Sequence, residues 1–289
     1  MTDYQKQLDA YRSAVEAYLG GCFTQTLPQA RLLEAMRYSL LAGGKRIRPI
    51  LVLEFCRVCG GKWETALPFA AAIEMIHTYS LIHDDLPCMD NDDYRRGRLT
   101  NHKVYGEALA VLAGDGLLTA AFETASMCDS PAQIRAEAVR ILASRAGELG
   151  MVGGQTLDLE WENRSLSAEE VTTIQRLKTG ALISAACELG VTSAGGSAEQ
   201  LDAARRYADA IGLAFQIRDD LLDVYGDAKK LGKAVHMDEN KSTFVRLFGA
   251  DRCRKRIEEL TKTAVDAVSC FDDPTVLTTL AMQLAVRDY

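Results

Sequence analysis

An acidic segment with five aspartates in ten residues, 84–93, is the first stretch that could do chemistry. Asp84 and Asp85 end a long apolar run, and Pro87 should end the helix there, so that Asp90 folds back beside Asp84 from the following loop. Carboxylates ~4 Å apart repel by roughly 1 kcal/mol in water and by about 4 kcal/mol at a protein-like effective dielectric. A cation is therefore expected among them, and such hard oxygen ligands favour Mg²⁺, which completes its shell with water and substrate phosphate.

A second acidic cluster follows about 135 residues later, inside a continuous helical pattern. Asp219, Asp220 and Asp223 stand at i, i+1 and i+4, which places Asp219 and Asp223 on one helix face. Gln216 lies one turn earlier on the same face. If the two acidic clusters face each other, they form a site for several metal ions.

Either cluster taken alone is more often an ordinary solvated face. An EF-hand is excluded, because Tyr94 and Arg95 occupy the places of its fifth ligand and its glycine. Cations accompany both clusters, since Arg95 and Arg96 follow the first and Lys233 follows the second by ten residues. Carboxylates, metal and cations together favour a polyanion site, most simply one for a diphosphate.

A separate basic motif, GGKRIRP at residues 43–49, places three cations at the start of a predicted helix, where the helix dipole disfavours positive charge. The motif does not have Walker A spacing. Lys45 and Arg48 can face the same way and hold an anion at the helix start. His77 lies two turns before the first acidic cluster on the same helix face and could reach that anion. The alternatives are ordinary surface charge for the motif and a core position for the histidine.

Composition limits the class of protein. The chain has 289 residues, and the 48% that are hydrophobic suffice for a packed core and exclude a disordered protein. The net charge of −7 argues against a nucleic-acid partner. Its 8 cysteines are dispersed and no apolar N-terminal leader is evident, so we expect reduced thiols and a cytoplasmic location. Charged residues interrupt every apolar run, so we expect no integral membrane segment.

The elements that must position these residues are predicted to be helices. Only 6 prolines occur, apolar residues recur at helical spacing, and two-residue alternation does not persist. Capping boxes are predicted at Ser167 with Glu170 and at Ser197 with Gln200, and Ser130 before a proline should cap another helix. We expect a single all-α domain over 1–289, with about ten helices and no sheet. The predicted helices are 3–19, 28–42, 47–59, 65–85, 104–127, 132–149, 168–188, 198–225, 252–270 and 275–286.

Five motifs in order resemble the trans-isoprenyl diphosphate synthases, particularly the bacterial farnesyl and geranylgeranyl diphosphate synthases. The motifs are GGKRIRP (43–49), EMIHTYSLIHDDLPCMDNDDYRR (74–96), GGQTLDL (153–159), KTG (178–180) and FQIRDDLLDVYGDAKKLG (215–232). This resemblance implies an all-α bundle around a deep central cavity, with the two aspartate motifs facing each other across its mouth. It also implies a homodimer.

The resemblance assigns roles by matching position. Ligands of a three-magnesium cluster are Asp84, Asp85, Asp90 and Asp219, supported by Asp220 and Asp223, and Mn²⁺ stays an alternative. Contacts to the allylic diphosphate are Arg95, Lys178 and Lys233. The isopentenyl diphosphate pocket comprises Gly44, Lys45, Arg48, His77 and Arg96, while Thr179 and Gln216 lie along the developing cation. The segment AVHMD at 234–238 lacks an expected glycine, so Asp238, Asn240 and Lys241 receive no role.

The implied reaction ionises an allylic diphosphate, adds isopentenyl diphosphate head to tail and releases a proton to pyrophosphate. Tyr79 and Ser80 lie about one helical turn, ~5.4 Å, below the first aspartates and are the expected floor that limits product length. A bulky Tyr79 resembles farnesyl-type enzymes, whereas CMDNDD and TNHKVYGE resemble geranylgeranyl synthases. The rival hypotheses are a class I terpene cyclase, which would normally carry a different second metal motif, and a noncatalytic subunit of an active partner.

Overall fold

The computed structural model describes residues 2–162, 164–225 and 243–286, and confirms the all-α class. The first helices are α1 (Asp3–Gly21), α2 (Ala30–Leu40), α3 (Ile47–Val58), α4 (Leu67–Asp84), α5 (Asn101–Tyr105), α6 (Glu107–Met127) and α7 (Ala132–Ala146). They are followed by α8 (Met151–Glu160), α9 (Ala168–Gln175), α10 (Ala181–Ser193), α11 (Ala198–Tyr225), α13 (Phe244–Phe248), α14 (Ala250–Ala267) and α15 (Thr275–Val286). A 3₁₀ turn, η1 (Trp63–Ala66), precedes α4, and a π-helical turn, η2 (Arg176–Gly180), joins α9 to α10.

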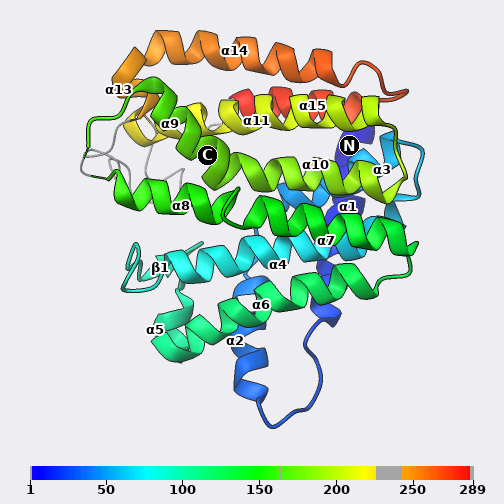
Figure 1. The fold of residues 1–289 in the computed structure, drawn as a ribbon, viewed down its shortest axis with the longest axis vertical. Helices are drawn as coiled ribbons and strands as arrows, with labels where there is room; N and C mark the ends of the chain where they lie inside the picture. The colour runs from blue at the N-terminus through cyan, green and yellow to red at the C-terminus, as the bar shows by residue number, and fades with distance from the viewer. Residues whose placement is uncertain (1, 163, 226–242, 287–289) are drawn as a thin grey trace.

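The long helices lie roughly parallel to one another. In Figure 1 they follow each other down the view from α14 through α11, α10, α7 and α4 to α6. Contacts between elements give the same order, because α14 packs on α11, α11 on α10, and α10 on α7 and α3. Helix α4 in turn packs between α3 and α6. Both acidic clusters therefore sit on helices of the same bundle.

The centre of the bundle consists of helices that are buried on every side. In α3 each residue from Ile50 to Cys56 is buried, and in α10 the same holds from Ala181 to Val191. A helix that is apolar all round belongs in an interior rather than at a surface. Helix α14 shows the opposite pattern, with a single buried stripe formed by Cys253, Ile257 and Leu260 and a charged outer face.

Buried ion pairs satisfy the few charges inside the bundle. Arg46, the N-cap of α3 with a φ of 51°, is 3% exposed, and its Nη1 donates to Glu74 Oε1 at 2.6 Å. Glu188 accepts hydrogen bonds from Arg145 and Arg205. Arg46 is thus a structural member of the basic motif, because its side chain turns inward and fixes the start of α3.

The expectation of no sheet is wrong at one place. β1 (Tyr94–Arg95) and β2 (Arg98–Leu99) form a short antiparallel pair directly after the first acidic cluster. The two turn residues, Arg96 and Gly97, have φ values of 53° and 73°. Positive φ at both central positions is the geometry of the tight turn that matches the twist of a hairpin. The pair is too short for alternation to reveal it.

Helix boundaries differ from the predictions where glycine or proline intervenes. Gly106, with a φ of 86°, separates α5 from α6 inside the predicted helix 104–127. Pro131, not Ser130, is the N-cap of α7, without a side-chain capping hydrogen bond. Helix α8 falls between the predicted helices 132–149 and 168–188, so it was not predicted. The capping boxes at Ser167 and Ser197 are confirmed.

Within the described ranges, one helix, α6, is long and apolar enough by length and composition to cross a membrane. It packs against α4, α2 and α7 as a member of the bundle. Leu112 is 54% exposed, whereas Val111, which is 39% exposed, lines a cavity beside α4. Part of the apolar surface of α6 therefore lies outside the core.

Candidate active site

The first acidic cluster lies where α4 ends. Asp84 is the last residue of the helix and Asp85 is its C-cap. The loop then folds back, because the Asp90 amide donates to the Asp84 carbonyl oxygen at 2.8 Å. Asn91, with a φ of 53°, donates its amide to Leu86 and closes the loop. This is the return of Asp90 toward Asp84 that the sequence predicted.

Asp85 and Asp84 differ in their surroundings. Asp85 is 3% exposed, and its Oδ1 accepts hydrogen bonds from Arg95 Nε at 2.7 Å and lies 2.6 Å from Arg95 Nη2. The hairpin β1–β2 therefore positions Arg95 as the partner of Asp85. Asp85 lines a small hollow together with Arg96, whereas Asp84 lines a larger, separate cavity.

The environment of Asp84 disfavours a bare carboxylate. Burial raises the pKa of Asp84 to about 6, Asp90 and Asp85 add to the increase, and Lys178 and Arg95 oppose it. Burial also raises the pKa of Asp85, although Arg95 opposes this. Lys178 thus does not fully compensate the charge of the cluster. A further cation at Asp84 would remove this electrostatic penalty.

A cavity of about 550 Å³ lies beneath Asp84. Its lining comes from α3, α4, α6, α8, η2 and α10, and includes Arg48, His77, Tyr79, Ser80, His83, Asp84, Val111, Gln155, Thr156, Lys178, Thr179 and Leu182. Charged groups lie near Asp84, while Leu86, Met89 and Leu159 supply apolar surface. The cavity thus combines a cationic and acidic region with an apolar one, as a ligand with a charged head and a hydrocarbon chain requires.

The predicted floor residue, Tyr79, lies in this cavity. Its side chain is buried and packs edge-on against His83, with ring centroids 5.7 Å apart. His83 Nε2 lies 3.1 Å from the Val111 carbonyl oxygen of α6. Gly114 leaves room for that ring, because a Cβ there would lie 2.1 Å from His83 Nε2. Tyr79 and His83 therefore form one wall that α6 supports.

Lys178 is positioned by a π-helical turn and by a close helix contact. Lys178 belongs to η2, and π-turns within helices are frequent at functional sites. Gly154 of α8 permits the contact, since a Cβ there would lie 2.2 Å from the Lys178 backbone nitrogen. Lys178 Nζ then donates to Asp158 Oδ2 at 2.6 Å. The motif GGQTLDL thus supplies both the close approach and the partner of this lysine.

The second acidic cluster lines a neighbouring hollow of about 230 Å³ on the other side of η2. Gln216, Asp219, Asp220 and Asp223 line it, together with Asp158, Lys178 and Thr179. Asp220 Oδ2 accepts a hydrogen bond from the Phe244 amide at 2.7 Å. Lys178 and Thr179 line both hollows, so η2 adjoins the hollow of each acidic cluster.

The predicted anion pocket is assembled in part. Arg48 and His77 both line the main cavity, and burial together with Arg48 and Arg96 lowers the pKa of His77. Arg48 Nε is buried and has no hydrogen-bond partner among the described residues. A donor left in this way beside other cations fits an anion that is bound during function.

Two further predicted members of that pocket, Arg96 and Lys45, do not line the main cavity. Arg96 donates to the Gly43 carbonyl oxygen, and its guanidinium occupies the space above Gly44, where a Cβ would lie 2.8 Å from Nη1. Lys45 is exposed. The hairpin and the basic motif therefore meet here through Arg96.

Part of the predicted site falls outside the described residues, namely Lys233, Asp238, Asn240 and Lys241. Sequence reasoning missed Gln155 and Asp158, because α8 was not predicted, although the motif that contains them was noted. In the described part of the chain, no three His, Cys, Asp or Glu side chains converge closely enough to hold a metal unaided. The carboxylates fit Mg²⁺ only together with oxygens from water and substrate, which is the usual way in which Mg²⁺ binds.

Comparisons with known proteins agree with this geometry. Residues 29–272 match the family model described as polyprenyl synthetase. The chain belongs to this family. Among its relatives, farnesyl diphosphate synthase of Geobacillus stearothermophilus is 46% identical over 255 residues, which are 86% of each chain. The large subunit 1 of heterodimeric geranylgeranyl pyrophosphate synthase of Arabidopsis thaliana is 47% identical over 87% of this chain and 70% of its own.

Solved structures of polyprenyl synthetases share the fold. The apo structure of an FPP/GFPP synthase from Zymomonas mobilis superposes with a TM-score of 0.88 at 36% identity, and covers 98% of this chain and 99% of its own. Polyprenyl synthetases generally use Mg²⁺. Asp84 at the end of α4 and Asp219 of α11 carry carboxylate oxygens, which are the donor type that this ion prefers.

Proposed function

We propose that this protein is a short-chain trans-prenyltransferase that condenses isopentenyl diphosphate with dimethylallyl or geranyl diphosphate to form farnesyl diphosphate. The observation that carries the proposal is one cavity of about 550 Å³ whose lining includes Asp84, Lys178, Arg48 and His77. Two diphosphate heads can be placed there, one at the aspartates and one at the arginine and histidine. The apolar remainder accommodates the hydrocarbon chain.

The aspartates are the proposed metal ligands. Asp84, Asp90 and Asp219 would hold up to three Mg²⁺ ions, with Asp220 and Asp223 in support and Mn²⁺ as an alternative ion. When bound, Mg²⁺ supplies charge that stabilises the departing diphosphate. Asp85 contributes through Arg95 in the present structure, because the arginine occupies its Oδ1. Its place in the cluster is therefore a positioning one.

Side chains of the cavity bind the two diphosphates and exclude water. Lys178 stabilises negative charge on the leaving diphosphate from η2, while Asp158 orients its ammonium group. Arg48 and a neutral His77 bind the second diphosphate, since burial and neighbouring arginines lower the pKa of the imidazole. Thr179 and Gln216 line the hollows on either side of η2 and face the developing cation. The apolar lining excludes water, which would otherwise trap that cation.

Product length follows from the wall that Tyr79 and His83 form. A chain that grows from Asp84 along α4 meets the buried Tyr79 ring about one helical turn, ~5.4 Å, away. Ser80 leaves space beside that ring and donates its hydroxyl to the His77 carbonyl oxygen. The bulk of Tyr79 favours the fifteen-carbon product. A geranylgeranyl product is the second candidate, because relatives named for both products show similar identity.

Assembly and location complete the proposal. The exposed apolar face of α6, which includes Leu112, is best covered by the same face of a second copy in a homodimer. All eight cysteines are free thiols in the structure, which supports a cytoplasmic location.

Turnover of aspartate variants tests the proposal. Asp84→Asn and Asp219→Asn should each abolish the condensation of geranyl and isopentenyl diphosphates with Mg²⁺. Asp93→Asn is the matched control, because Asp93 belongs to the same acidic segment but pairs with Lys103 at 2.7 Å. If Asp84→Asn keeps more than about a tenth of wild-type turnover, the loss of transition-state stabilisation is too small for the assigned role.

A further inference from the structure

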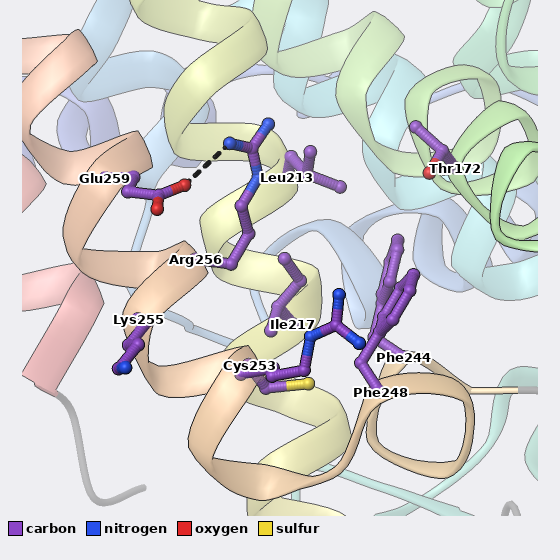
Figure 2. Close-up of a pocket in the computed structure, with 10 residues that line it drawn as sticks. Thr172, Leu213, Ile217, Phe244, Phe248, Cys253, Lys255, Arg256 and Glu259 are labelled. Atoms are coloured by element: carbon purple, nitrogen blue, oxygen red, sulfur yellow. Dashed lines mark hydrogen bonds and ion pairs between the residues drawn. The ribbon is translucent and has the colours of Figure 1, made fainter.

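A hollow of about 420 Å³ lies beside α11, separate from the hollow that the second acidic cluster lines. Figure 2 shows its lining, which comes from α9, α11, α13 and α14 and comprises Thr172, Leu213, Ile217, Phe244, Phe248, Arg252, Cys253, Lys255, Arg256 and Glu259. None of these residues lines either hollow of the active site. The volume is within the range of small-molecule sites, about 300–1,000 Å³.

The floor of this hollow is apolar. Ile217 is buried, Leu213 lies one turn before it on α11, and Cys253 of α14 is also buried. The Phe244 and Phe248 rings of α13 stack with centroids 6.4 Å apart and an interplanar angle of 17°. Aromatic and aliphatic surface of this kind favours a hydrocarbon chain over a fully polar ligand.

The rim of the hollow is cationic. Arg252, Lys255 and Arg256 of α14 line it, against the single carboxylate of Glu259, which lies 2.9 Å from Arg256 Nη1. The Arg252 guanidinium lies 5.4 Å above the Phe248 ring. Among the residues that the structure describes, it makes no ion pair with a carboxylate. Arg252 and Arg256 stand four residues apart, so their side chains project from the same side of α14.

The chemistry of the rim selects the head group. Guanidinium groups offer planar, paired donors that match phosphate oxygens, and they lose less hydration than an ammonium on binding. The charge excess of the rim complements an anion of this type. We propose that this hollow is a second ligand site, which binds a single-chain phosphorylated amphiphile with its phosphate at Arg252 and Arg256 and its chain on the Phe244 and Ile217 floor.

The site is mechanically linked to the active site through α13. Phe244 places its ring in the hollow, while its amide donates to Asp220 Oδ2 at 2.7 Å. Thr243, the preceding residue, lines the hollow of the second acidic cluster. A chain that packs on the Phe244 ring and shifts α13 would therefore also shift the amide that donates to Asp220. This coupling rests on the proposed function, whereas the binding itself does not.

Binding is tested on the full chain without Mg²⁺ and with a chelator, so that the aspartates do not recruit phosphate through a metal. Isothermal titration uses farnesyl monophosphate and dodecyl phosphate, which distinguish an isoprenoid from a straight-chain source, and inorganic phosphate alone. Arg252→Gln should weaken binding of the amphiphiles about tenfold, the typical effect of losing one charge-assisted hydrogen bond. Arg254→Gln is the matched control, because Arg254 pairs with Asp251 and does not line the hollow.

Each result of the titration either supports the proposed ligand site or overturns it. Equal binding by wild type and Arg252→Gln would assign the amphiphile to the main cavity and overturn the proposal. Inorganic phosphate that binds as tightly as the amphiphiles would overturn it as well, because the apolar floor would then contribute nothing. Tighter binding of either amphiphile in wild type and Arg254→Gln than in Arg252→Gln supports it and identifies the chain type.

Coupling is measured separately, as prenyl transfer with Mg²⁺ over a range of allylic substrate concentrations at saturating isopentenyl diphosphate. The preferred amphiphile should lower kcat severalfold in wild type and Arg254→Gln, but not in Arg252→Gln. A rise in the allylic KM without a fall in kcat would show competition in the main cavity and contradict the coupling. If the wild-type protein shows no prenyl transfer without the amphiphile, the proposed function fails while the binding result stands.

Discussion

At the scale of single residues, Asp84 carries the clearest conflict between stability and function. Its carboxyl group sits near Asp90 and Asp85 in a partly buried place, and the pKa is raised from 3.8 to about 6. Sequence reasoning found the residue and the repulsion from five aspartates in one segment. It did not predict the ion pair between Arg95 and Asp85, because only the hairpin brings that arginine back to the end of α4.

Removing the charge of Asp84 should stabilise the metal-free protein. Because the folded-state pKa lies above the unfolded value, the folded protein binds more protons between pH 3.8 and about 6, and its stability falls as pH rises through that window. Asp84→Asn should therefore raise the free energy of unfolding at neutral pH by about 1 to 2 kcal/mol, after allowance for partial solvent screening. Urea unfolding in chelator measures this gain.

The same experiment at acid pH is its control. The gain should vanish below the unfolded pKa, where Asp84 is protonated in both states. An Asp84→Asn variant that is less stable than wild type at neutral pH would show that the carboxylate is already compensated in the metal-free protein.

Substitution of Arg46 should lower stability, whereas substitution of its neighbour Lys45 should affect substrate binding. Arg46→Ala leaves Glu74 buried without its partner and should cost about 3 to 5 kcal/mol of unfolding free energy. Lys45→Ala, at an exposed neighbour, should change stability by less than about 0.5 kcal/mol while it raises the KM for isopentenyl diphosphate. Chemical denaturation and steady-state kinetics give the two readouts. Equal losses of stability in both variants would contradict the division of roles.

At the scale of elements, helical periodicity predicted most of the bundle, because α3, α4, α11 and α14 have long uninterrupted patterns. It failed where tertiary contact outweighs local preference. Gly154 is a poor helix former in isolation, yet α8 needs it to approach η2. The π-turn of η2 likewise leaves no mark in the spacing of its residues. Both failures fall at the site, where Lys178 must be held.

A methyl group at Gly154 should therefore damage catalysis through Lys178. In Gly154→Ala the Cβ would lie 2.2 Å from the Lys178 backbone nitrogen, so α8 or η2 must move. We expect a loss of about 1 to 3 kcal/mol in stability and at least a tenfold fall in kcat. Gly180→Ala is the matched control in the same turn, because its Cβ would meet only the Gln175 carbonyl oxygen at 3.6 Å. Unaltered kcat in Gly154→Ala would show that the close contact does not position Lys178.

At the scale of the whole molecule, the bundle brings segments about 135 residues apart to the two sides of η2. The sequence predicted that the acidic clusters would belong to one site, but not the turn that separates their hollows. It also predicted association with a second copy only through resemblance. The structure adds an exposed apolar face on α6 that a second copy can cover.

The proposed homodimer makes α6 sensitive to charge. Leu112→Glu, at a residue 54% exposed on α6, should shift the protein toward a monomer in sedimentation velocity. Met282→Glu on α15, where the side chain is 51% exposed, is the matched control and should leave the association unchanged. A monomeric wild-type protein, or a Leu112→Glu variant that still dimerises, would contradict this interface.

The identity of the prenyl product tests the central claim most directly. The wild-type protein, given isopentenyl diphosphate, an allylic diphosphate and Mg²⁺, should yield farnesyl diphosphate, and Tyr79→Ala should yield longer chains, as resolved by chromatography of the released alcohols. Pyrophosphate release that does not need isopentenyl diphosphate, or no prenyl product at all, would contradict the account. An unchanged product in Tyr79→Ala would remove Tyr79 as the floor of the cavity.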